Sequence, residues 1–377
     1  MSDEVIEFYQ HCLRVHNYNP AARYKVAHEL SKKIEASKKD IASYLGADSR
    51  QLIFTSGGTE SINTVLCTLP YRTGIRHKRI LITSGEHSAT KQAADFLAKK
   101  HGYEVMVVGL DASGRVDLTE LRSLLSCEKQ FDLFSYIVVN NQLGSVNDCV
   151  QMKRICQELQ PHMLLHGDAV QVPTKIDFSF QRSGLDFASF SCHKFGAPKG
   201  CGFLLTQKPE KLPALIMGGG QQNALRAGTE NPALVFTIAK ALQVATTDLV
   251  KKRQQITSLQ EQFYRELNAK TEQGQLNFVR ISDDKAVPHI NVVAFPQLRA
   301  ETLLNCLSAE NICVSIGSAC SSKSTEQNVL YKQFLAQSSL KNIDQHVLRI
   351  SLAETNTAEE VHELVESISR AIKRFAR

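Results

Sequence analysis

The chain has 377 residues, of which 43% are hydrophobic and 22% charged, and its formal net charge is +6. This length allows a large hydrophobic core and more than one domain, and the composition is that of an ordinary globular protein. The basic residues form no block of like charges, so the sequence carries no signature of direct nucleic-acid binding.

The cysteine pattern and the N-terminus indicate the cellular compartment. None of the 10 cysteines forms a CxxC pair, and no His/Cys cluster has the spacing of a metal site. The first residues, MSDEVIEFYQ, lack the apolar core of a signal peptide, and no apolar run approaches the roughly 20 residues that span a bilayer. We therefore expect a reducing, cytoplasmic compartment, no membrane segment, no metal, and mostly buried cysteines.

Strand and helix patterns alternate through the middle of the chain. Strands are predicted for the β-rich apolar runs QLIFTS, RILITS, EVMVVGL, FSYIVV, HMLLHGDAV, DFASFS and GCGFLL. Helical stretches such as SATKQAADFLAKKHG and LTELRSLLS lie between them. This alternation predicts a mostly parallel sheet covered by helices on both faces, with ligands bound beyond the carboxyl ends of the strands.

The pattern changes after Gly228. Residues 232–270 predict one long amphipathic helix that leads to a second domain, which starts near Phe278 with a strand in HINVVAF, a helix in RAETLLNCLSAE and a strand in LRISL. Thr357 and Glu360 form a capping box for the last helix. Its apolar stripe then packs on the domain, and it consists of Val361, Leu364, Val365, Ile368 and Ile372.

These patterns predict an α/β protein with two domains. The large domain, with the sheet between layers of helices, is expected over residues 14–255. A smaller C-terminal α+β domain is expected over residues 256–377, and residues 1–13 could pack on it.

Three features at predicted strand ends suit one cofactor. TSGGTES (55–61) offers two glycines and the N–H groups of a helix start, which bind phosphate. Asp168 ends a strand, where a buried carboxylate can pair with a pyridinium nitrogen. Lys194 follows another strand, and we expect it to be buried with a lowered pKa, as in Schiff-base lysines. Each feature alone could be a turn, a helix cap or a surface residue, but together they predict pyridoxal phosphate (PLP); RAGTE (226–230) is a second candidate anion site.

Six segments, in the same order along the chain, resemble class V aminotransferases and most closely the cysteine desulfurase family of the NifS/IscS kind. They are TSGGTES, GEHSA, VNNQLGSVND, HGDAVQ, SCHKFGAPKG and GGGQQNALRAGTEN. The resemblance covers nearly the whole chain and implies the PLP-dependent transferase fold of aspartate aminotransferase type.

The resemblance also implies roles for individual residues. Lys194 would hold PLP as a Schiff base, Asp168 would pair with the ring nitrogen, and His87 would stack on the ring and carry protons. The remaining ligands implied are Gln171 and Asn141 for the ring hydroxyl region, Gly58, Thr59, Ser191 and His193 for the phosphate, Thr229 supplied by the second subunit of a homodimer, and Arg349 with Asn141 for the substrate carboxylate.

The segment SIGSACSSKST resembles the family's mobile-loop motif, whose cysteine accepts sulfur. Here that residue is Cys320, with Lys323 nearby to stabilise its thiolate. A small buried cysteine is the alternative, but a Gly/Ser-rich loop is a poor core. The implied reaction converts L-cysteine to L-alanine and leaves a persulfide on Cys320 for an acceptor protein; iron–sulfur scaffolds, tRNA thiolation pathways and other carriers all remain open.

Two departures from the family pattern leave alternatives. The usual opening strand of type YLDNxATT is absent, so either the chain is shortened or the substrate pocket is built differently. Gln142 stands where glutamate is usual. Two other interpretations therefore stay open: a selenocysteine lyase or other PLP-dependent C–S or C–Se lyase, and a catalytically impaired relative that binds only the cofactor or a partner protein.

Overall fold

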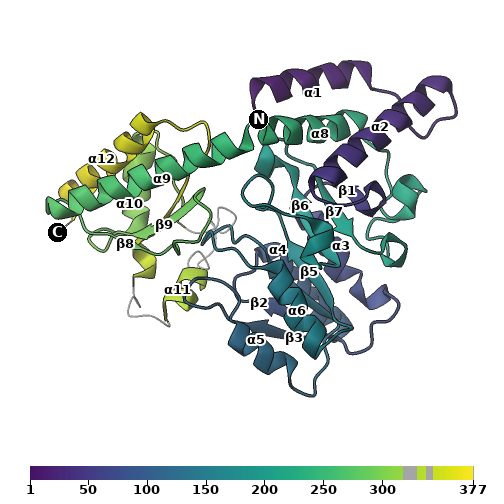
Figure 1. Cartoon of the computed structure of the whole chain (residues 1–377), viewed down its shortest axis with the longest axis horizontal. Helices are drawn as coiled ribbons and strands as arrows, with labels where there is room; N and C mark the ends of the chain where they lie inside the picture. Colours follow the sequence, from purple (N-terminus) through teal and green to yellow (C-terminus); the bar gives the residue numbers. More distant parts are fainter. Residues whose placement is uncertain (317–328, 337–342, 377) are drawn as a thin grey trace. The chain divides into compact units, whose positions relative to one another are not determined.

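The structure is a computed structural model that describes residues 1–316, 329–336 and 343–376. The chain forms two compact units (Figure 1), whose segments are Met1–Gly109, Asp117–Val138 and Asn147–Thr247 in unit 1, and Leu110–Val116, Val139–Val146 and Asp248–Arg377 in unit 2. The domain limits expected at 14–255 and 256–377 stay a prediction.

Unit 1 is built on a seven-stranded sheet in the order β1-β7-β6-β5-β4-β2-β3. Because β7 runs antiparallel to both β6 and β1 and the other neighbours are parallel, all the strands except β7 share one direction. The predicted mostly parallel sheet is therefore confirmed. The strands are β1 Leu52–Thr55, β2 Arg79–Thr83, β3 Glu104–Val108, β4 Leu133–Ile137, β5 Leu164–Asp168, β6 Phe187–Ser191 and β7 Gly202–Thr206.

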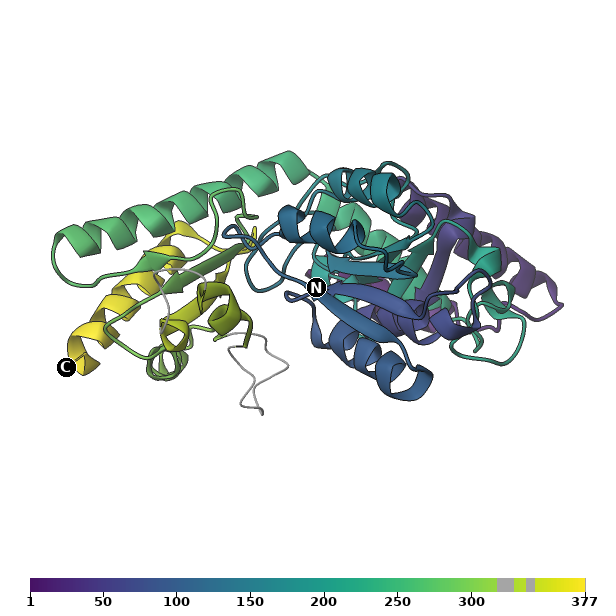
Figure 2. The same cartoon turned by 90° about the horizontal axis from the view of Figure 1, so that it is seen from below.

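Helices cover both faces of this sheet (Figure 2), as its buried central strands require. They are α1 Asp3–Val15, α2 Lys25–Tyr44, α3 Gly58–Cys67, α4 Ser88–His101, α5 Leu118–Leu125, α6 Cys149–Leu159, α7 Phe180–Ser183 and α8 Pro232–Thr246. Short 3₁₀ turns follow two of the strands, η3 Cys192–Phe195 after β6 and η4 Pro209–Lys211 after β7.

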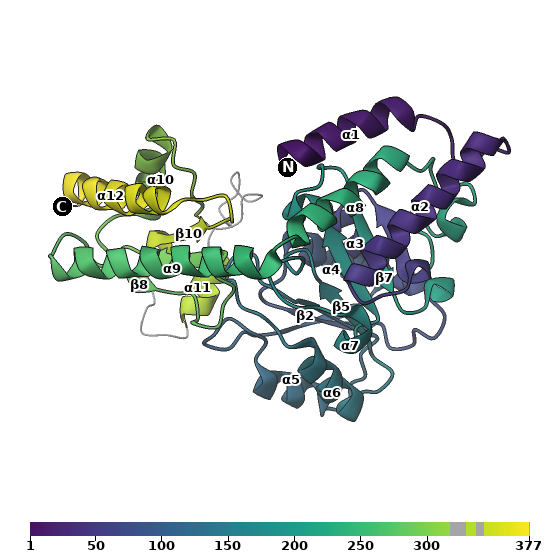
Figure 3. The same cartoon turned by 45° about the horizontal axis from the view of Figure 1, so that its top comes forward.

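The N-terminal helix α1 packs beside α8 within unit 1 (Figure 3), as α2 does. Cys12 of α1 shares a small core with Leu30 of α2 and Phe236 of α8. Residues 1–13, which the sequence analysis allowed to pack on the C-terminal domain, thus find their apolar partner in unit 1.

Unit 2 is an α+β unit, as predicted. Its antiparallel sheet has the order β10-β9-β8, and one core joins this sheet to α9, α10 and α12. Helices α9 and α12 lie side by side (Figures 1 and 3). The elements are β8 Val279–Arg280, β9 Ile290–Ala294 and β10 Val347–Ser351, with α9 Leu249–Glu272, α10 Ala300–Ala309, α11 Val329–Ala336 and α12 Ala358–Phe375.

The last helix forms as the sequence predicts. The Thr357 side chain accepts the Glu360 N–H, and the Glu360 carboxylate accepts the Thr357 N–H, so the capping box is confirmed. The predicted stripe is buried in the core of unit 2: Val361, Leu364, Val365, Ile368 and Ile372.

The predicted single helix over 232–270 is wrong. The structure ends α8 at Thr246 and starts α9 at Leu249, because Asp248 takes a left-handed conformation with φ 54°. Each helix then serves its own unit. In the described part of the chain no single helix is long and apolar enough to cross a membrane; only α8 and α9 taken together, bent at their break, have the required length and composition.

Candidate active site

The carboxyl ends of β1, β2, β5 and β6 lie at one edge of the sheet in unit 1, because these strands run in the same direction. Predicted site residues follow each of them: Thr59 after β1, His87 after β2, Asp168 at the end of β5, and Lys194 after β6. This edge is where open α/β sheets bind ligands.

The start of α3 is a cradle built from glycines. Gly57 has φ 157° and ψ 179°, a conformation open essentially only to glycine. A Cβ on Gly58 would lie 2.7 Å from Cγ2 of Val170 and 3.4 Å from Cβ of Ser191. The first N–H groups of α3 therefore lie against the loop after β5 and the end of β6, where they can bind an anion such as phosphate. Thr59 is exposed in the same turn.

Ser191 and His193 extend this cradle from the neighbouring strand. The Ser191 hydroxyl lies 3.0 Å from Nδ1 of His193. Partial burial, followed by the charges of Lys194 and Lys199, lowers the pKa of His193.

Lys194 lies in η3, directly after β6, and its side chain is exposed in the single chain. The expectation that it is buried is therefore wrong, although its position at the strand end is as predicted. The reason is local: β6 ends at Ser191, and the 3₁₀ turn that follows carries the lysine out of the sheet.

Asp168 supplies a buried acid at the centre of this edge. It is 5% exposed and accepts a hydrogen bond from Val170 N–H at 3.0 Å. Burial raises its pKa, while the Val170 hydrogen bond and the nearby His87 lower it. A carboxylate in such a dry place is stabilised by a cationic N–H group, so the residue fits the protonated ring nitrogen of PLP.

His87 caps the start of α4. Its Nδ1 accepts the Ala89 N–H at 3.1 Å, so a neutral ring carries its proton on Nε2. Gln171 follows Asp168 on the same loop and is half-buried.

The segment 226–230, which the sequence allows as a second anion site, stays a prediction, and its arginine already has a partner within the chain. The Arg226 guanidinium contacts the Glu60 carboxylate at 3.0 Å, so its charge is met within the chain. Thr229 of this segment is exposed in the single chain.

Two predicted residues lie in unit 2 and contact one another there. Nη1 of Arg349 donates to the Asn141 carbonyl at 2.9 Å, and the Arg349 backbone pairs with that of Ser315. Among the described residues, Nε of Arg349 is buried without a hydrogen-bond partner. Cys320 and Lys323 lie outside the described residues.

Glu86 is not among the site residues predicted from the sequence, although it lies between β2 and His87 within the GEHSA segment. It is 3% exposed, and the charge of Asp168 acts on its carboxyl group. The sequence signal available was an acidic residue in the short turn after a strand with an apolar centre.

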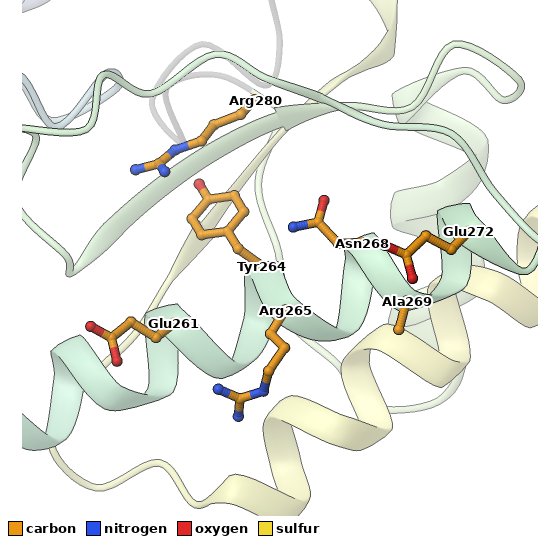
Figure 4. Close-up of a pocket in the computed structure, with 7 residues that line it drawn as sticks. All are labelled: Glu261, Tyr264, Arg265, Asn268, Ala269, Glu272 and Arg280. Carbon is orange, nitrogen blue, oxygen red and sulfur yellow. The ribbon is translucent and has the colours of Figure 1, made fainter.

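A surface hollow of about 520 Å³ lies on unit 2, between α9 and β8 (Figure 4). The Arg280 guanidinium stacks over the Tyr264 ring there, 4.3 Å from its centroid. The hollow contains none of the predicted site residues, and no group of three or more His, Cys, Asp or Glu among the described residues could hold a metal ion.

Comparison with known proteins shows the family of the chain. The family model for aminotransferase class-V matches residues 1–364, so the chain belongs to this family of PLP-dependent enzymes. Within it, the chain is similar to the cysteine desulfurase IscS of Dictyoglomus turgidum, at 31% identity over 99% of this chain and 92% of that protein. It is also similar to the IscS of Methanosarcina thermophila, at 30% identity over 95% and 85% of the two chains. A solved NifS-like protein is 30% identical over 100% of this chain and 97% of its own, with a TM-score of 0.88.

Proposed function

We propose that this protein is a PLP-dependent cysteine desulfurase. The observation that carries the proposal is the grouping, at one sheet edge, of a glycine phosphate cradle at Gly57–Gly58, the buried acid Asp168, and a lysine on the next strand end. Relatives named cysteine desulfurase over nearly the whole chain support the same choice.

Bound through Lys194, PLP would supply an electron sink next to the α-carbon of the substrate. The chain's own residues bind and orient it. Gly58, Thr59, Ser191 and His193 would hold the phosphate, together with Thr229 from a second subunit. Asp168 would keep the ring nitrogen protonated, and His87 would stack on the ring and transfer a proton through Nε2. Gln171 and Asn141 would bind the ring hydroxyl region.

Arg349 binds the carboxylate of L-cysteine, with Asn141 beside it. The Cys320 thiolate then attacks the substrate sulfur. The C–S bond of the substrate breaks and an S–S bond forms, so carbon is reduced and sulfur is oxidised. The α-amino acid leaves as L-alanine, with a proton taken up at Cβ. Cys320 keeps the sulfur as a persulfide, which passes to an acceptor protein.

The cofactor assignment is tested by the visible absorption of the purified protein. Lys194→Ala should abolish the band of covalently bound PLP, because no other residue is proposed to bond with the aldehyde. Lys199→Ala is the matched control, since Lys199 is an exposed lysine shortly after the same 3₁₀ turn, and it should keep the band. Retention of the band in Lys194→Ala would show that another lysine holds the cofactor.

A further inference from the structure

Glu86 is a buried acid whose role the proposed mechanism does not use. It lies in the turn after β2 and is 3% exposed. Burying an ionised carboxylate is costly unless it is paired or hydrogen-bonded, so the contacts of both its oxygens decide its state.

One oxygen of Glu86 accepts two hydrogen bonds, one from the end of β4 and one from the end of β2. Oε1 accepts the Ile137 N–H at 3.0 Å and the Thr83 hydroxyl at 2.5 Å. The pairing of β2 with β4 stops at Ile82 and Ser135, so beyond that point the Ile137 amide meets the carboxyl group in place of a strand. Ile137 is also the register partner of Asp168 on β5. Glu86 therefore fixes the strand end that borders the cofactor's acid.

The other oxygen indicates the protonation state. Within the described part of the chain, Oε2 is buried and has no hydrogen-bond partner. A carboxylate would leave this oxygen charged, dry and unpaired, near the negative charge of Asp168. A neutral carboxylic acid carries no charge, so it avoids this buried charge and its repulsion by Asp168.

The groups around Glu86 also favour a neutral carboxylic acid. Burial raises the pKa of Glu86 to about 8. The charge of Asp168 also raises it, whereas the hydrogen bonds from Thr83 and Ile137 and the Lys91 ammonium on α4 lower it without reversing the shift. His87, the next residue, acts on Asp168.

We propose that Glu86 is a positioning residue that works as a neutral carboxylic acid: it fixes the end of β4 and the turn carrying His87, and it leaves Asp168 as the one ionised carboxylate facing the ring nitrogen. The second half of this inference rests on the proposed PLP site. If both Glu86 and Asp168 were ionised at this dry site, the two carboxylates would repel each other. One of them would then take up a proton, and that one could be Asp168.

The protonation state is tested without cofactor, by infrared difference spectra of the apoprotein. At pH 7 the wild type should show the C=O stretch of a protonated carboxyl that Glu86→Gln lacks, and this band should disappear as the pH rises through about 8. Glu120→Gln is the matched control. The Glu120 carboxylate also accepts a backbone amide, that of Gly109, but it is exposed to water, so its replacement should remove no such band.

The position of the proton is tested with Asp168→Asn. If the band persists in Glu86→Gln and disappears in Asp168→Asn, the proton belongs to Asp168 and the inference is overturned. Absence of any protonated-carboxyl band would overturn it too.

The positioning role is tested by PLP binding. Glu86→Gln keeps an acceptor for Ile137 and a donor in place of the acid O–H, so its dissociation constant for PLP should stay within about threefold of wild type. Glu86→Leu leaves the Ile137 amide buried without an acceptor, and it should weaken binding about tenfold or more if it folds. A loss in Glu86→Gln as large as in Glu86→Leu would contradict a neutral Glu86. If no variant, nor the wild type, binds PLP, the proposed function fails while the infrared result still stands.

Discussion

His166 lies two residues before Asp168 on β5, and its ring is enclosed by hydroxyl groups. Ser135 Oγ of β4 lies 2.7 Å from Nδ1, and Ser189 Oγ of β6 lies 2.9 Å from Nε2. The side chain is fully buried, and burial lowers its pKa to about 3. The three strands nearest Asp168 are thus joined by a neutral imidazole.

This burial predicts a pH dependence of stability. Between the unfolded pKa of 6.5 and the folded pKa of about 3, the unfolded state binds more protons at this group. Stability is therefore fully present above pH 6.5 and is lost as the pH falls, by up to about 1.4 kcal/mol per pH unit. In urea unfolding of the apoprotein from pH 7 to pH 5, His166→Asn should show a shallower loss than wild type. The exposed His162→Asn should match wild type; an unchanged slope in His166→Asn would refute the assignment.

The residues of the site differ in how far sequence predicts them. Asp168, His87 and Lys194 each follow a recognisable strand, so their place at the sheet edge is predictable. The exposure of Lys194 is not, because it depends on where β6 ends and how η3 turns. Glu86 escapes sequence analysis for a related reason. The proposed role of Glu86 depends on its hydrogen bond with the Ile137 N–H. That N–H has no strand partner only because the pairing of β2 with β4 stops before Ile137.

At the scale of elements, the contact between β7 and the start of α3 fixes the proposed phosphate-binding turn at Gly57 and Gly58. A Cβ on Gly202 would lie 2.5 Å from Cα of Gly57 and 2.6 Å from the Phe190 carbonyl oxygen. Both are backbone atoms, which cannot move aside as a flexible side chain does.

Gly202→Ala should therefore push α3 away from the sheet and lower the free energy of unfolding by about 1–3 kcal/mol, with weaker phosphate binding. The matched control is Gly220→Ala, where a Cβ meets no atom within 4 Å and φ is −80°. It should change stability by less than about 1 kcal/mol. Equal effects in denaturant titrations of the two variants would show that the close approach is unimportant.

Helices and strands with a clear apolar pattern or capping motif can be predicted from the sequence, but the points where a helix breaks are harder to predict. The apolar runs of the sheet and the capping box of α12 agree with the structure. The break between α8 and α9 has no glycine or proline at Thr247 and Asp248 to announce it. It arises because the two helices bury their apolar faces in different cores, which is a tertiary effect.

At the scale of the whole molecule, the two units interleave in sequence. Leu110–Val116 and Val139–Val146 follow strands of the large sheet but belong to unit 2. There the second of them meets Arg349 through Asn141 and Tyr331 through the Gln142 carbonyl. No periodicity in these short loops could reveal this assignment.

The proposed homodimer makes a prediction about shared sites. If Thr229 serves the phosphate of the other subunit and Thr229→Ala by itself loses PLP, Lys194→Ala and Thr229→Ala should complement each other. Random mixing gives hetero-dimers with one intact site, so co-expression should restore covalent PLP to about one quarter of the sites. The variants expressed separately are the controls, with sedimentation to establish the dimer. No gain on co-expression above the separate variants would place Thr229 in its own subunit's site or outside any site.

The central claim concerns sulfur transfer, and one experiment addresses it directly. The purified protein, loaded with PLP, is given L-cysteine, and alanine and persulfide are measured by mass spectrometry. We expect alanine to form in step with persulfide on Cys320. Cys320→Ala should lose both persulfide and turnover while it retains PLP. The exposed Cys127→Ala serves as the control and should behave as wild type. Undiminished sulfur release by Cys320→Ala, or alanine from selenocysteine but not from cysteine, would contradict the proposed desulfurase and favour a lyase that needs no persulfide. Bound PLP without any product would favour a catalytically impaired relative.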